Sequence, residues 1–368
     1  MKVTVKKIKN ESDVLQILKG LNFNKLFQNE EKVYIKPNFV APRDNSTGAT
    51  TNLKIIKTIA EALNTIGVNP IIIETPGMEY NVEDVFNALN IYDFAEQNNI
   101  GLCIPKPKDF VKRKIFQGKV LKFAEIPQQI LNYKLINIPV MKTHVITTIT
   151  LGMKNLMGLC SNSTKRMMHV KGIHKTIVDL NKLIIPDLTI IDATNTMQGD
   201  GAVYGDHKKL DIVIASQNTI AADKIGCRIM GLEESTISFL NLTNFKKKIQ
   251  IDGELKCYDF TLPKPGKIYR LIYRLLYFID IFFFSFFKTH FNKFLYSTGL
   301  IGTRPEILKK CTKCGICSDI CPVNAILMEK QKIDYKKCIR CLKCLEVCPE
   351  KAIIIKGVSK PEKIKKND

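Results

Sequence analysis

The feature that most constrains this chain is a cysteine motif that occurs twice near its carboxyl terminus. The first copy of C-x2-C-x2-C-x3-C, followed at once by a proline, comprises Cys311, Cys314, Cys317 and Cys321. The second copy, 27 residues later and again followed by a proline, comprises Cys338, Cys341, Cys344 and Cys348. Two-residue gaps let three thiolates of one loop reach one iron–sulfur cluster, while the fourth thiolate reaches a second cluster. The spacing predicts two 4Fe–4S clusters, one held by Cys311, Cys314, Cys317 and Cys348 and the other by Cys338, Cys341, Cys344 and Cys321.

Zinc sites are the alternative interpretation, but zinc does not require this doubled spacing with its prolines. The other four cysteines of the chain are scattered, and its first residues lack the apolar run of a secretory signal peptide. We therefore expect reduced thiols or metal ligands rather than disulfides. We also expect a cytoplasmic protein, which one hypothesis below places at the membrane surface. An anaerobic source is expected as well, because exposed clusters are oxygen-sensitive.

The net charge of +21, from 56 basic and 35 acidic residues, predicts an anionic partner. Residues 304–357 alone hold twelve Lys or Arg and six Asp or Glu. That balance favours a cluster module that stays with its own chain or receives electrons from an acidic redox protein. Nucleic acid is disfavoured as a partner because no recognition motif accompanies the charge.

Residues 1–262 alternate short apolar runs with helical patterns and predict one α/β domain. The expected strands cover 2–8, 33–38, 70–77, 134–140, 188–194 and 211–216, and the expected helices cover 51–67, 174–184 and 218–231. Strands rich in Ile and Val, separated by helices, predict a mostly parallel sheet with helices on both faces. Residues 304–357 are expected to form a smaller α+β module, followed by a disordered basic tail over 358–368.

Residues 263–303 form the expected connection between these parts, with an amphipathic helix over 268–288. Its apolar stripe comprises Ile268, Leu271, Ile272, Leu275, Leu276, Ile279, Phe282, Phe283 and Phe286. Arg274 and Asp280 argue against a membrane span. We expect a linker helix packed on the first domain; the alternative is a helix that lies in a membrane interface.

Polar residues follow several of the predicted strands. Lys36 and Asn38, then Lys142 and His144, close two apolar runs, and Asp192 ends a third. Lys154 and Asn155 lie in a glycine-flanked segment, and Asp200 lies between two glycines. In open α/β sheets, ligands bind at the carboxyl ends of the strands. A glycine-rich nucleotide-binding motif is absent from the sequence.

Five segments of the first domain, in order along the chain, carry a family resemblance. They are KPN (36–38), PVMKTH (139–144), LGMKNLMG (151–158), IIDATNTMQGDGAVYGD (190–206) and AADKIG (221–226). Together they resemble the domain of unknown function 362, which is often fused to a bacterial-type two-cluster ferredoxin module. The resemblance implies an α/β domain in an iron–sulfur protein and implies no particular reaction.

We assign hypothetical roles to the strand-end residues from their chemistry. Lys36, Lys142 and Lys154 would bind an anionic or polarised substrate, and Asn38 and Asn155 would orient it. His144 would be the proton donor, because its unperturbed pKa lies near neutrality. Asp192 and Asp200 would orient these groups or hold a divalent cation. Cys160, near the second lysine–asparagine pair, is expected to be a buried thiol rather than a nucleophile or ligand.

The preferred hypothesis is a reductase in which the clusters relay electrons from a redox protein to a substrate in this site. The substrate would be an anionic small molecule or, if 268–288 contacts a membrane, a lipid-soluble one. The alternatives are a non-catalytic electron-transfer or assembly protein that docks an acidic partner, and a nucleic-acid-binding redox sensor. A reductase predicts a closed pocket around the lysines, whereas a docking protein predicts a flat basic face. We expect Lys36→Ala and Lys142→Ala to change stability by less than about 0.5 kcal/mol, as surface changes do.

Overall fold

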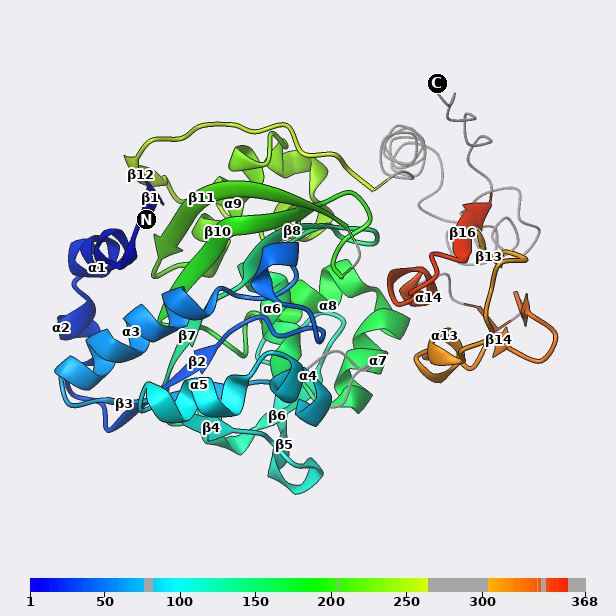
Figure 1. Cartoon of the computed structure of the whole chain (residues 1–368), viewed down its shortest axis with the longest axis horizontal. Coiled ribbons are helices and arrows are strands. Elements are labelled where there is room, and N and C mark those ends of the chain that lie inside the picture. Colours follow the sequence, from blue (N-terminus) through cyan, green and yellow to red (C-terminus); the bar gives the residue numbers. More distant parts are fainter. Residues whose placement is uncertain (76–81, 204, 264–303, 336, 339–341, 357–368) are drawn as a thin grey trace. The chain divides into compact units, whose positions relative to one another are not determined.

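The computed structural model describes residues 1–75, 82–203, 205–263, 304–335, 337–338 and 342–356 (Figure 1). The chain divides into two units, Met1–Pro263 and Lys264–Asp368. The predicted amphipathic helix over 268–288 and the predicted tail over 358–368 lie outside the described residues.

The first unit is built on a sheet with the strand order β12-β1-β11-β10-β7-β2-β3-β4, in which β8 pairs with both β10 and β9. Its strands are β1 (Lys2–Lys7), β2 (Lys32–Lys36), β3 (Asn69–Ile73), β4 (Gly101–Cys103), β7 (Lys134–Asn137), β8 (Val140–His144), β9 (Thr148–Thr150), β10 (Leu188–Gln198), β11 (Asp206–Ser216) and β12 (Gln250–Gly253). Six of the pairings between these described strands are parallel and three are antiparallel. The prediction of a mostly parallel sheet is confirmed.

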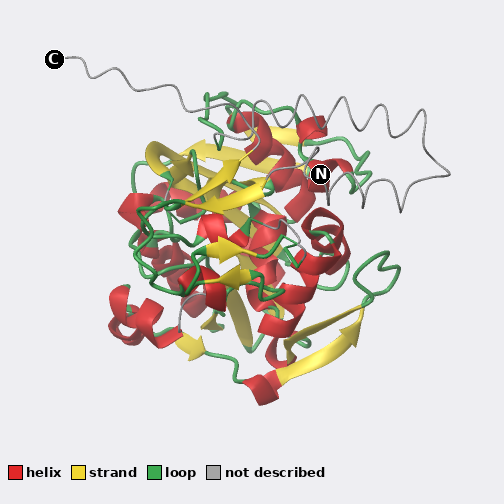
Figure 2. Cartoon of the chain, turned by 90° about the vertical axis from the view of Figure 1, so that its right-hand side faces the viewer, coloured by secondary structure: helices red, strands yellow, loops and turns green. Residues whose placement is uncertain are grey.

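Helices cover both faces of this sheet, as Figure 2 shows with yellow strands between red helices. One face is covered by α1 (Glu11–Gly20), α2 (Phe23–Phe27), α3 (Leu53–Thr65), α4 (Val82–Ala88) and α5 (Ile91–Gln97). The other face is covered by α6 (Gly152–Asn155), α7 (Asn162–Lys171), α8 (Ile173–Leu180), α9 (Thr219–Ile229) and α10 (Ser238–Asn241). Successive residues of a strand point to opposite faces. Accordingly, Ile190 belongs to the first core and Ile191 to the second.

Helix α3 shows how the sequence sets an element that positions the site. The Asn52 side chain caps the helix by accepting a hydrogen bond of 3.0 Å from the Lys54 N–H. Buried side chains at Ile55, Ile59 and Leu63 recur at helical spacing and face the core. The helix ends before Gly67, whose φ of +76° is a left-handed conformation that favours glycine.

The sheet also has antiparallel arms that the sequence did not predict. Strand β10 continues to Gln198, and β11 begins at Asp206, so the two pair well beyond their apolar runs. These extensions are polar and carry no apolar run of the kind used to predict strands. The single strand predicted over 134–140 is two strands, β7 and β8, interrupted at Pro139, which has no N–H to donate to a ladder. A separate hairpin comprises β5 (Phe110–Lys114) and β6 (Phe123–Pro127).

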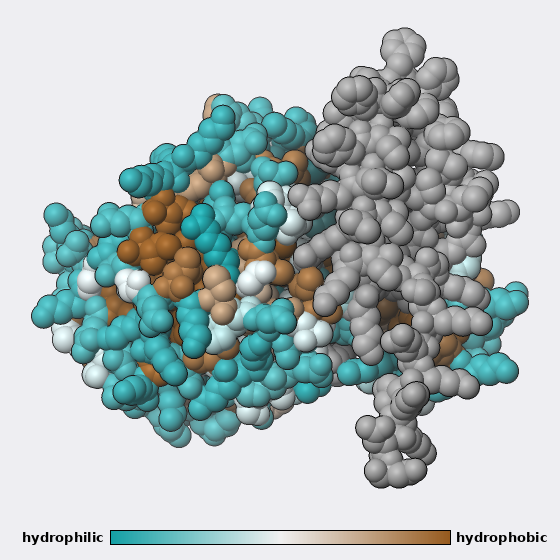
Figure 3. All heavy atoms as spheres, turned by 90° about the horizontal axis from the view of Figure 1, so that it is seen from above, coloured by the Kyte–Doolittle hydropathy of each residue, from teal (hydrophilic) through white to brown (hydrophobic). Residues whose placement is uncertain are grey.

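Short 3-10 helices complete the first unit at η1 (Asn45–Thr47), η2 (Pro107–Asp109), η3 (Gln128–Ile130), η4 (Leu156–Leu159) and η5 (Glu234–Thr236). Seen from above, its described surface is mostly hydrophilic, with smaller apolar areas between (Figure 3). Among the described helices, none has the length and apolar character needed to cross a membrane.

The second unit is a small α+β module, as the sequence predicted. Strand β13 (Arg304–Ile307) pairs antiparallel with β16 (Ile353–Lys356), and β14 (Ile326–Leu327) pairs with β15 (Lys332–Ile333). Helix α13 (Ile316–Asp319) and helix α14 (Lys343–Glu346) each lie within one copy of the cysteine motif. The sequence repeat is therefore also a structural repeat.

Candidate functional site

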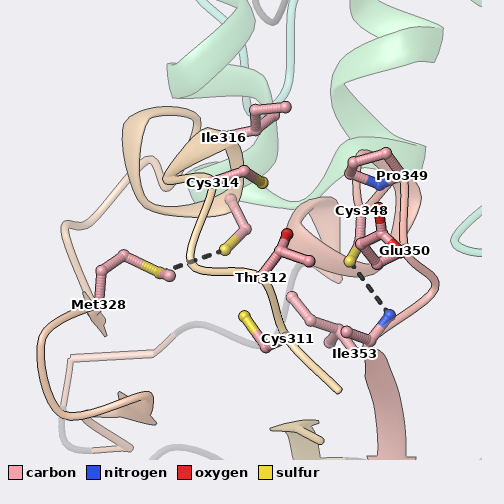
Figure 4. Close-up of a pocket in the computed structure, with 11 residues that line it drawn as sticks. Cys311, Thr312, Cys314, Ile316, Met328, Cys348, Pro349, Glu350 and Ile353 are labelled. Carbon is pink, nitrogen blue, oxygen red and sulfur yellow. Dashed lines mark hydrogen bonds between the residues drawn. The ribbon is translucent and has the colours of Figure 1, made fainter. Parts of the chain in front are cut away.

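One pocket of the second unit brings together Cys311, Cys314, Cys317 and Cys348 (Figure 4). Three of these cysteines come from the first copy of the motif and the fourth comes from the second. The Ala352 N–H donates to the Sγ of Cys348 at 3.1 Å, and the Lys313 N–H donates to the Sγ of Cys311 at 3.4 Å. Such bonds stabilise thiolate ligands and tune a cluster's potential. The soft four-sulfur donor set fits a 4Fe–4S cluster.

Burial raises the pKa of the Cys317 thiol to about 11, and the neighbouring Cys348, Cys311 and Cys314 contribute to that shift. Four thiols this close together would repel one another as thiolates. These four cysteines would hold an iron–sulfur cluster, whose positively charged iron would offset that repulsion.

A second pocket is lined by Cys321, Cys338 and Cys344, with Pro305, Leu342 and apolar residues around them. The Ala325 N–H donates to the Sγ of Cys321 at 3.2 Å, which matches the bond from Ala352 to Cys348 in the other half. Cys341 lies outside the described residues. The allocation of four cysteines to each cluster stays a prediction.

The first unit has a buried polar network at the carboxyl ends of its parallel strands. Lys36 ends β2, and Glu74 follows β3, the neighbouring parallel strand. Their side chains form an ion pair with an Nζ–Oε1 distance of 2.6 Å and are 1% and 3% exposed. Burial lowers the pKa of Lys36, and the carboxylate of Glu74 opposes that shift. The pair is therefore a buried group that can hold a proton at the carboxyl ends of β2 and β3.

Glu74 is fixed by bonds beyond the ion pair. Its carboxylate accepts from the N–H of Phe39 at 2.9 Å and from the N–H of Thr75 at 2.9 Å. A Cβ added to Gly158 would lie 2.7 Å from the Cε of Lys36, so a side chain at this position would displace the lysine end of the ion pair.

A chain of three asparagines crosses the same edge. Asn155 on α6 donates through Nδ2 to Asn137 Oδ1 at 2.8 Å and accepts from Asn38 Nδ2 at 2.8 Å. The Pro37 carbonyl accepts from both Asn155 Nδ2, at 3.2 Å, and Lys36 Nζ, at 2.6 Å. The amides and the ion pair therefore form one connected network.

Lys142 on β8 also joins this network. Its ammonium donates to Asn38 Oδ1 at 2.5 Å, to the Ala49 carbonyl, and to the Ala202 carbonyl at 3.4 Å. Lys142 is 1% exposed. Both lysines are thus buried and bonded, so they do not form the flat basic face that the docking hypothesis required of them.

This burial corrects the expectation that alanine substitution at either lysine changes stability little. That expectation treated Lys36 and Lys142 as surface residues, whereas each is 1% exposed. Removing one partner of a buried ion pair leaves an uncompensated charge and typically costs about 3–5 kcal/mol.

Asp192 lies on β10 and is turned inward. Its carboxylate accepts from the Asn52 N–H at 2.8 Å, from the Thr194 N–H at 2.9 Å and from the Thr194 hydroxyl at 2.6 Å. Burial raises the pKa of Asp192, while these bonds and the charge of Lys142 oppose the shift. This bonding links Asp192 to the start of α3, and its predicted orienting role stays a prediction.

The other predicted residues lie around the network. The backbone N–H groups of Ile146 and Thr147 donate to Nδ1 of His144 at 3.0 and 3.3 Å, which places the ring proton on Nε2. Lys154 lies half-buried on α6. Asp200 lies half-buried in the loop after β10, which contacts β8 through a 2.8 Å bond from the Thr143 hydroxyl to the Gly199 carbonyl.

The divalent cation predicted at Asp192 and Asp200 has no support from this geometry. Within the described part of the first unit, His, Cys, Asp and Glu side chains nowhere form a group of three that could hold a metal ion. The buried Cys160 has a pKa raised to about 12 by burial, which opposes the thiolate form needed for nucleophilic attack or metal ligation.

Sequence reasoning missed three residues that support the site. Glu74 follows the apolar run of β3, and Asn137 interrupts the apolar run of β7. A polar residue in or directly after an apolar run could therefore have identified both. Asp223 on α9 is fully buried and accepts from the N–H groups of Gly152 and Met153 at 2.7 and 2.8 Å. It thereby fixes the start of α6, the helix that carries Asn155. Burial raises the pKa of Asp223 to about 7.

The second unit defines the class of the protein, because residues 306–362 match the model of a 4Fe–4S dicluster domain. The chain is therefore an iron–sulfur protein with an electron-transfer role. Residues 33–228, more than half of the chain, match the domain of unknown function DUF362. The chain belongs to that family.

One curated protein is similar over a shorter stretch. Thylakoid-associated protein sll1697 of Synechocystis sp. is 32% identical over 108 residues, which are 28% of this chain and 34% of that protein. The chain thus spans about a third of the length of the curated relative that it matches.

Proposed function

We propose that this protein is an iron–sulfur reductase whose substrate binds at the carboxyl ends of β2, β3, β8 and β10. The observation that carries the proposal is the buried Lys36–Glu74 pair, joined through backbone and amide groups to Lys142. Buried ionisable groups with shifted pKa values at a strand-end edge are typical of catalytic sites. Two buried lysines at the strand ends support the proposal, because burying a charge is costly to the fold.

The proposed reaction is the reduction of a double bond or another activated group, which takes up two electrons and two protons. When bound, two 4Fe–4S clusters supply single electrons that come from a reduced redox protein. Lys36 gives one proton to the substrate, because burial lowers the pKa of its ammonium and Glu74 stabilises the charged form between turnovers. Water supplies the second proton and then reprotonates Lys36.

Lys36 replaces His144 as the proposed proton donor. Two backbone N–H groups point at Nδ1 of His144, so a second ring proton on that atom would face two donors. His144 therefore suits a hydrogen-bond donor through Nε2 rather than an acid. Lys142 and Asn38 would bind and orient the polarised group of the substrate, and Lys154 and Asp200 keep the binding and orienting roles proposed from the sequence.

Two substrate classes fit this site. An anionic small molecule would be attracted by Lys142 and Lys154. A lipid-soluble substrate, such as a quinone or a polyprenyl chain, is supported by the name of the Synechocystis relative, which places that protein at the thylakoid. The alternative function is a non-catalytic electron-transfer or assembly protein that docks an acidic partner through the basic second unit.

The proposal is tested by single-turnover oxidation of the reduced protein. Anaerobic full-length protein, reduced with dithionite and freed of excess reductant, is mixed with a short-chain quinone or with an α,β-unsaturated carboxylate. Cluster absorbance reports the oxidation. We expect one acceptor class to oxidise the wild type, and Glu74→Gln to slow that oxidation at least about a hundredfold, the usual contribution of a positioned acid.

The matched control is Glu61→Gln, which removes the carboxylate of the exposed Lys57–Glu61 pair on α3. Its rate should equal that of the wild type. Equal rates for Glu74→Gln and wild type, at equal iron content, would contradict the catalytic proposal and favour the docking alternative.

A further inference from the structure

The hairpin of β5 and β6 lies at the lower edge of the first unit in Figure 1. Apolar side chains on and near it are exposed to solvent. Phe116 in its turn is 79% exposed and Phe123 at the start of β6 is 44% exposed. Ile185, which follows α8, is 72% exposed. Phe116 and Ile185 are the two most exposed large apolar side chains of the described residues. Exposed apolar side chains that lie together mark interaction sites, whereas singly scattered ones are ordinary.

The turn of the hairpin is bonded to the end of α8. The Asp179 carboxylate accepts from the backbone N–H groups of Lys119, Val120 and Leu121 at 2.7–3.0 Å. The Lys182 ammonium donates to the Gln117 carbonyl at 2.8 Å. The segment that carries Ile185 is therefore joined to the turn that carries Phe116, and both are held in place before any partner binds.

The inner side of the hairpin is packed, so its outer side is free to contact a partner. Ile115, Leu121, Ala124 and Ile126 are buried in the core of the first unit. Strand alternation then turns Lys112, Lys114 and Phe123 outward, and Lys112 Nζ lies 5.0 Å from the centre of the Phe123 ring. The exposed positions are occupied by basic and aromatic side chains.

The charge around these apolar groups is strongly positive. Residues 106–123 contain seven Lys or Arg and one Asp. Exposed members of this set are Lys106, Lys108, Lys112, Arg113, Lys114, Lys119 and Lys122. We name the surface formed by residues 112–123 and Ile185 the basic hairpin tip.

We propose that the basic hairpin tip binds the surface of an anionic lipid bilayer. Phe116 and Ile185 would enter the interface, where aromatic and aliphatic side chains are favoured, and the lysines would contact anionic headgroups. A bilayer is favoured over an acidic protein because these apolar side chains protrude from a turn. A protein partner would need a pocket to receive them, whereas the bilayer interface does not. The inference does not depend on the reductase proposal.

The chain contains no Trp, so one introduced Trp reports its own position. Full-length Phe116→Trp is mixed with vesicles of phosphatidylcholine containing phosphatidylglycerol, with or without acyl-chain bromination. We expect a blue shift of the emission on binding and quenching by the brominated lipid. The matched control is Leu15→Trp, which replaces a 45% exposed Leu on α1 and should show neither change.

Co-sedimentation of otherwise unmodified protein with the same vesicles tests the contribution of each part. We expect Phe116→Ser with Ile185→Ser to weaken binding at least about tenfold. Lys112→Gln and Lys114→Gln should each weaken it about fivefold, and raising the salt concentration should progressively remove the lysine contribution. Leu15→Ser with Leu242→Ser, at 45% and 44% exposed positions elsewhere, should leave binding unchanged.

Three results would overturn the inference. One is an emission of the Phe116→Trp variant that vesicles leave unchanged. Another is vesicle binding that survives the hairpin substitutions but is lost when Phe282, Phe283 and Phe286 become Ser, which would assign the contact to the segment over 268–288. The third is an emission shift of the Phe116→Trp variant that an acidic redox protein produces and vesicles do not, which would make the tip a protein-docking surface.

Discussion

The two units of this protein assemble their candidate sites in opposite ways. In the second unit, all predicted cluster ligands lie between Cys311 and Cys348, in two copies of one local spacing. In the first unit, the polar network joins residues from position 36 to position 155, carried by β2, β7, β8, the segments that follow β2 and β3, and the short helix α6. A local site can be recognised from spacing alone. A site made by long-range packing depends on which strands become neighbours, and no local pattern records that.

The largest effect is expected from breaking the local site. Cys348→Ser and Cys321→Ser should each remove one ligand from a different cluster, so reconstituted protein should fall from about eight iron atoms per chain toward about four. Iron and sulfide analysis with paramagnetic resonance of the reduced protein measures this. The far-ultraviolet signal and unfolding of the first unit should not change. Zinc in place of iron, or a single cluster in the wild type, would show that the assignment from spacing is wrong.

The second prediction breaks the long-range site. Glu74→Gln leaves the buried Lys36 ammonium without its counter-charge and should lower the free energy of unfolding by about 3 kcal/mol. Lys36→Met combined with Glu74→Gln should recover most of this loss, because the unpaired charge is then gone. Urea unfolding measures both variants. The exposed-pair control, Glu61→Gln, should lose less than about 0.5 kcal/mol.

An equal and small loss for Glu74→Gln and Glu61→Gln would contradict the buried ion pair. Iron content should be the same in all these variants, because the network lies outside the iron–sulfur unit. A loss of iron on substitution at Glu74 would show instead that cluster binding depends on the polar network of the first unit.

The third prediction concerns pH. Burial raises the folded-state pKa of Asp223 to about 7, well above its ordinary value. The folded state therefore binds this proton more tightly than the unfolded state does, and stability should fall as pH rises toward 7. The expected loss between about pH 5 and about pH 7 is roughly 2 kcal/mol. Asp223→Asn should remove this slope, which urea unfolding at several pH values would reveal. If the free energy of unfolding of Asp223→Asn still falls with pH as in the wild type, Asp223 is not the group that causes the fall.

The smallest effect is expected at Cys160, the buried cysteine of the first unit. Its thiol stays protonated because burial raises its pKa to about 12. Cys160→Ala should leave the iron content unchanged and cost about 1 kcal/mol of stability. Alkylation of the folded protein at mildly alkaline pH should spare Cys160. Loss of iron in this variant would mean that the first unit also supplies a cluster ligand.

The same contrast explains what could be predicted from sequence. The α/β class, the mostly parallel sheet and helix α3 followed from local apolar patterns. The sequence also singled out five residues of the site. Four of them follow or end an apolar run, and one lies in a glycine-flanked segment: Lys36, Asn38, Lys142 and Asp192, and Asn155. Their mutual bonds could not be predicted, since Lys142 meets Asn38 across 104 residues of chain.

The residues that were missed carry a weaker local signal. Asn137 is a single polar residue within an apolar stretch, and Asp223 stands beside Lys224 on α9. Their partners, Asn155 and the N–H groups at the start of α6, lie on other elements. The polar arms of β10 and β11 form because each pairs with the other, so no apolar run marks them. The treatment of Lys36 and Lys142 as surface residues in the stability prediction was wrong for a related reason, because burial is set by neighbours that come from elsewhere in the chain.

The central claim is that electrons from the clusters and a proton from the Lys36–Glu74 pair meet at one substrate. Single-turnover oxidation by the acceptor found for the wild type, measured in H2O and in D2O, tests it most directly. The account predicts a solvent isotope effect in the wild type and a rate at least about a hundredfold lower in Glu74→Gln, with unchanged iron content and cluster spectra. Equal rates in both proteins and no isotope effect would contradict it.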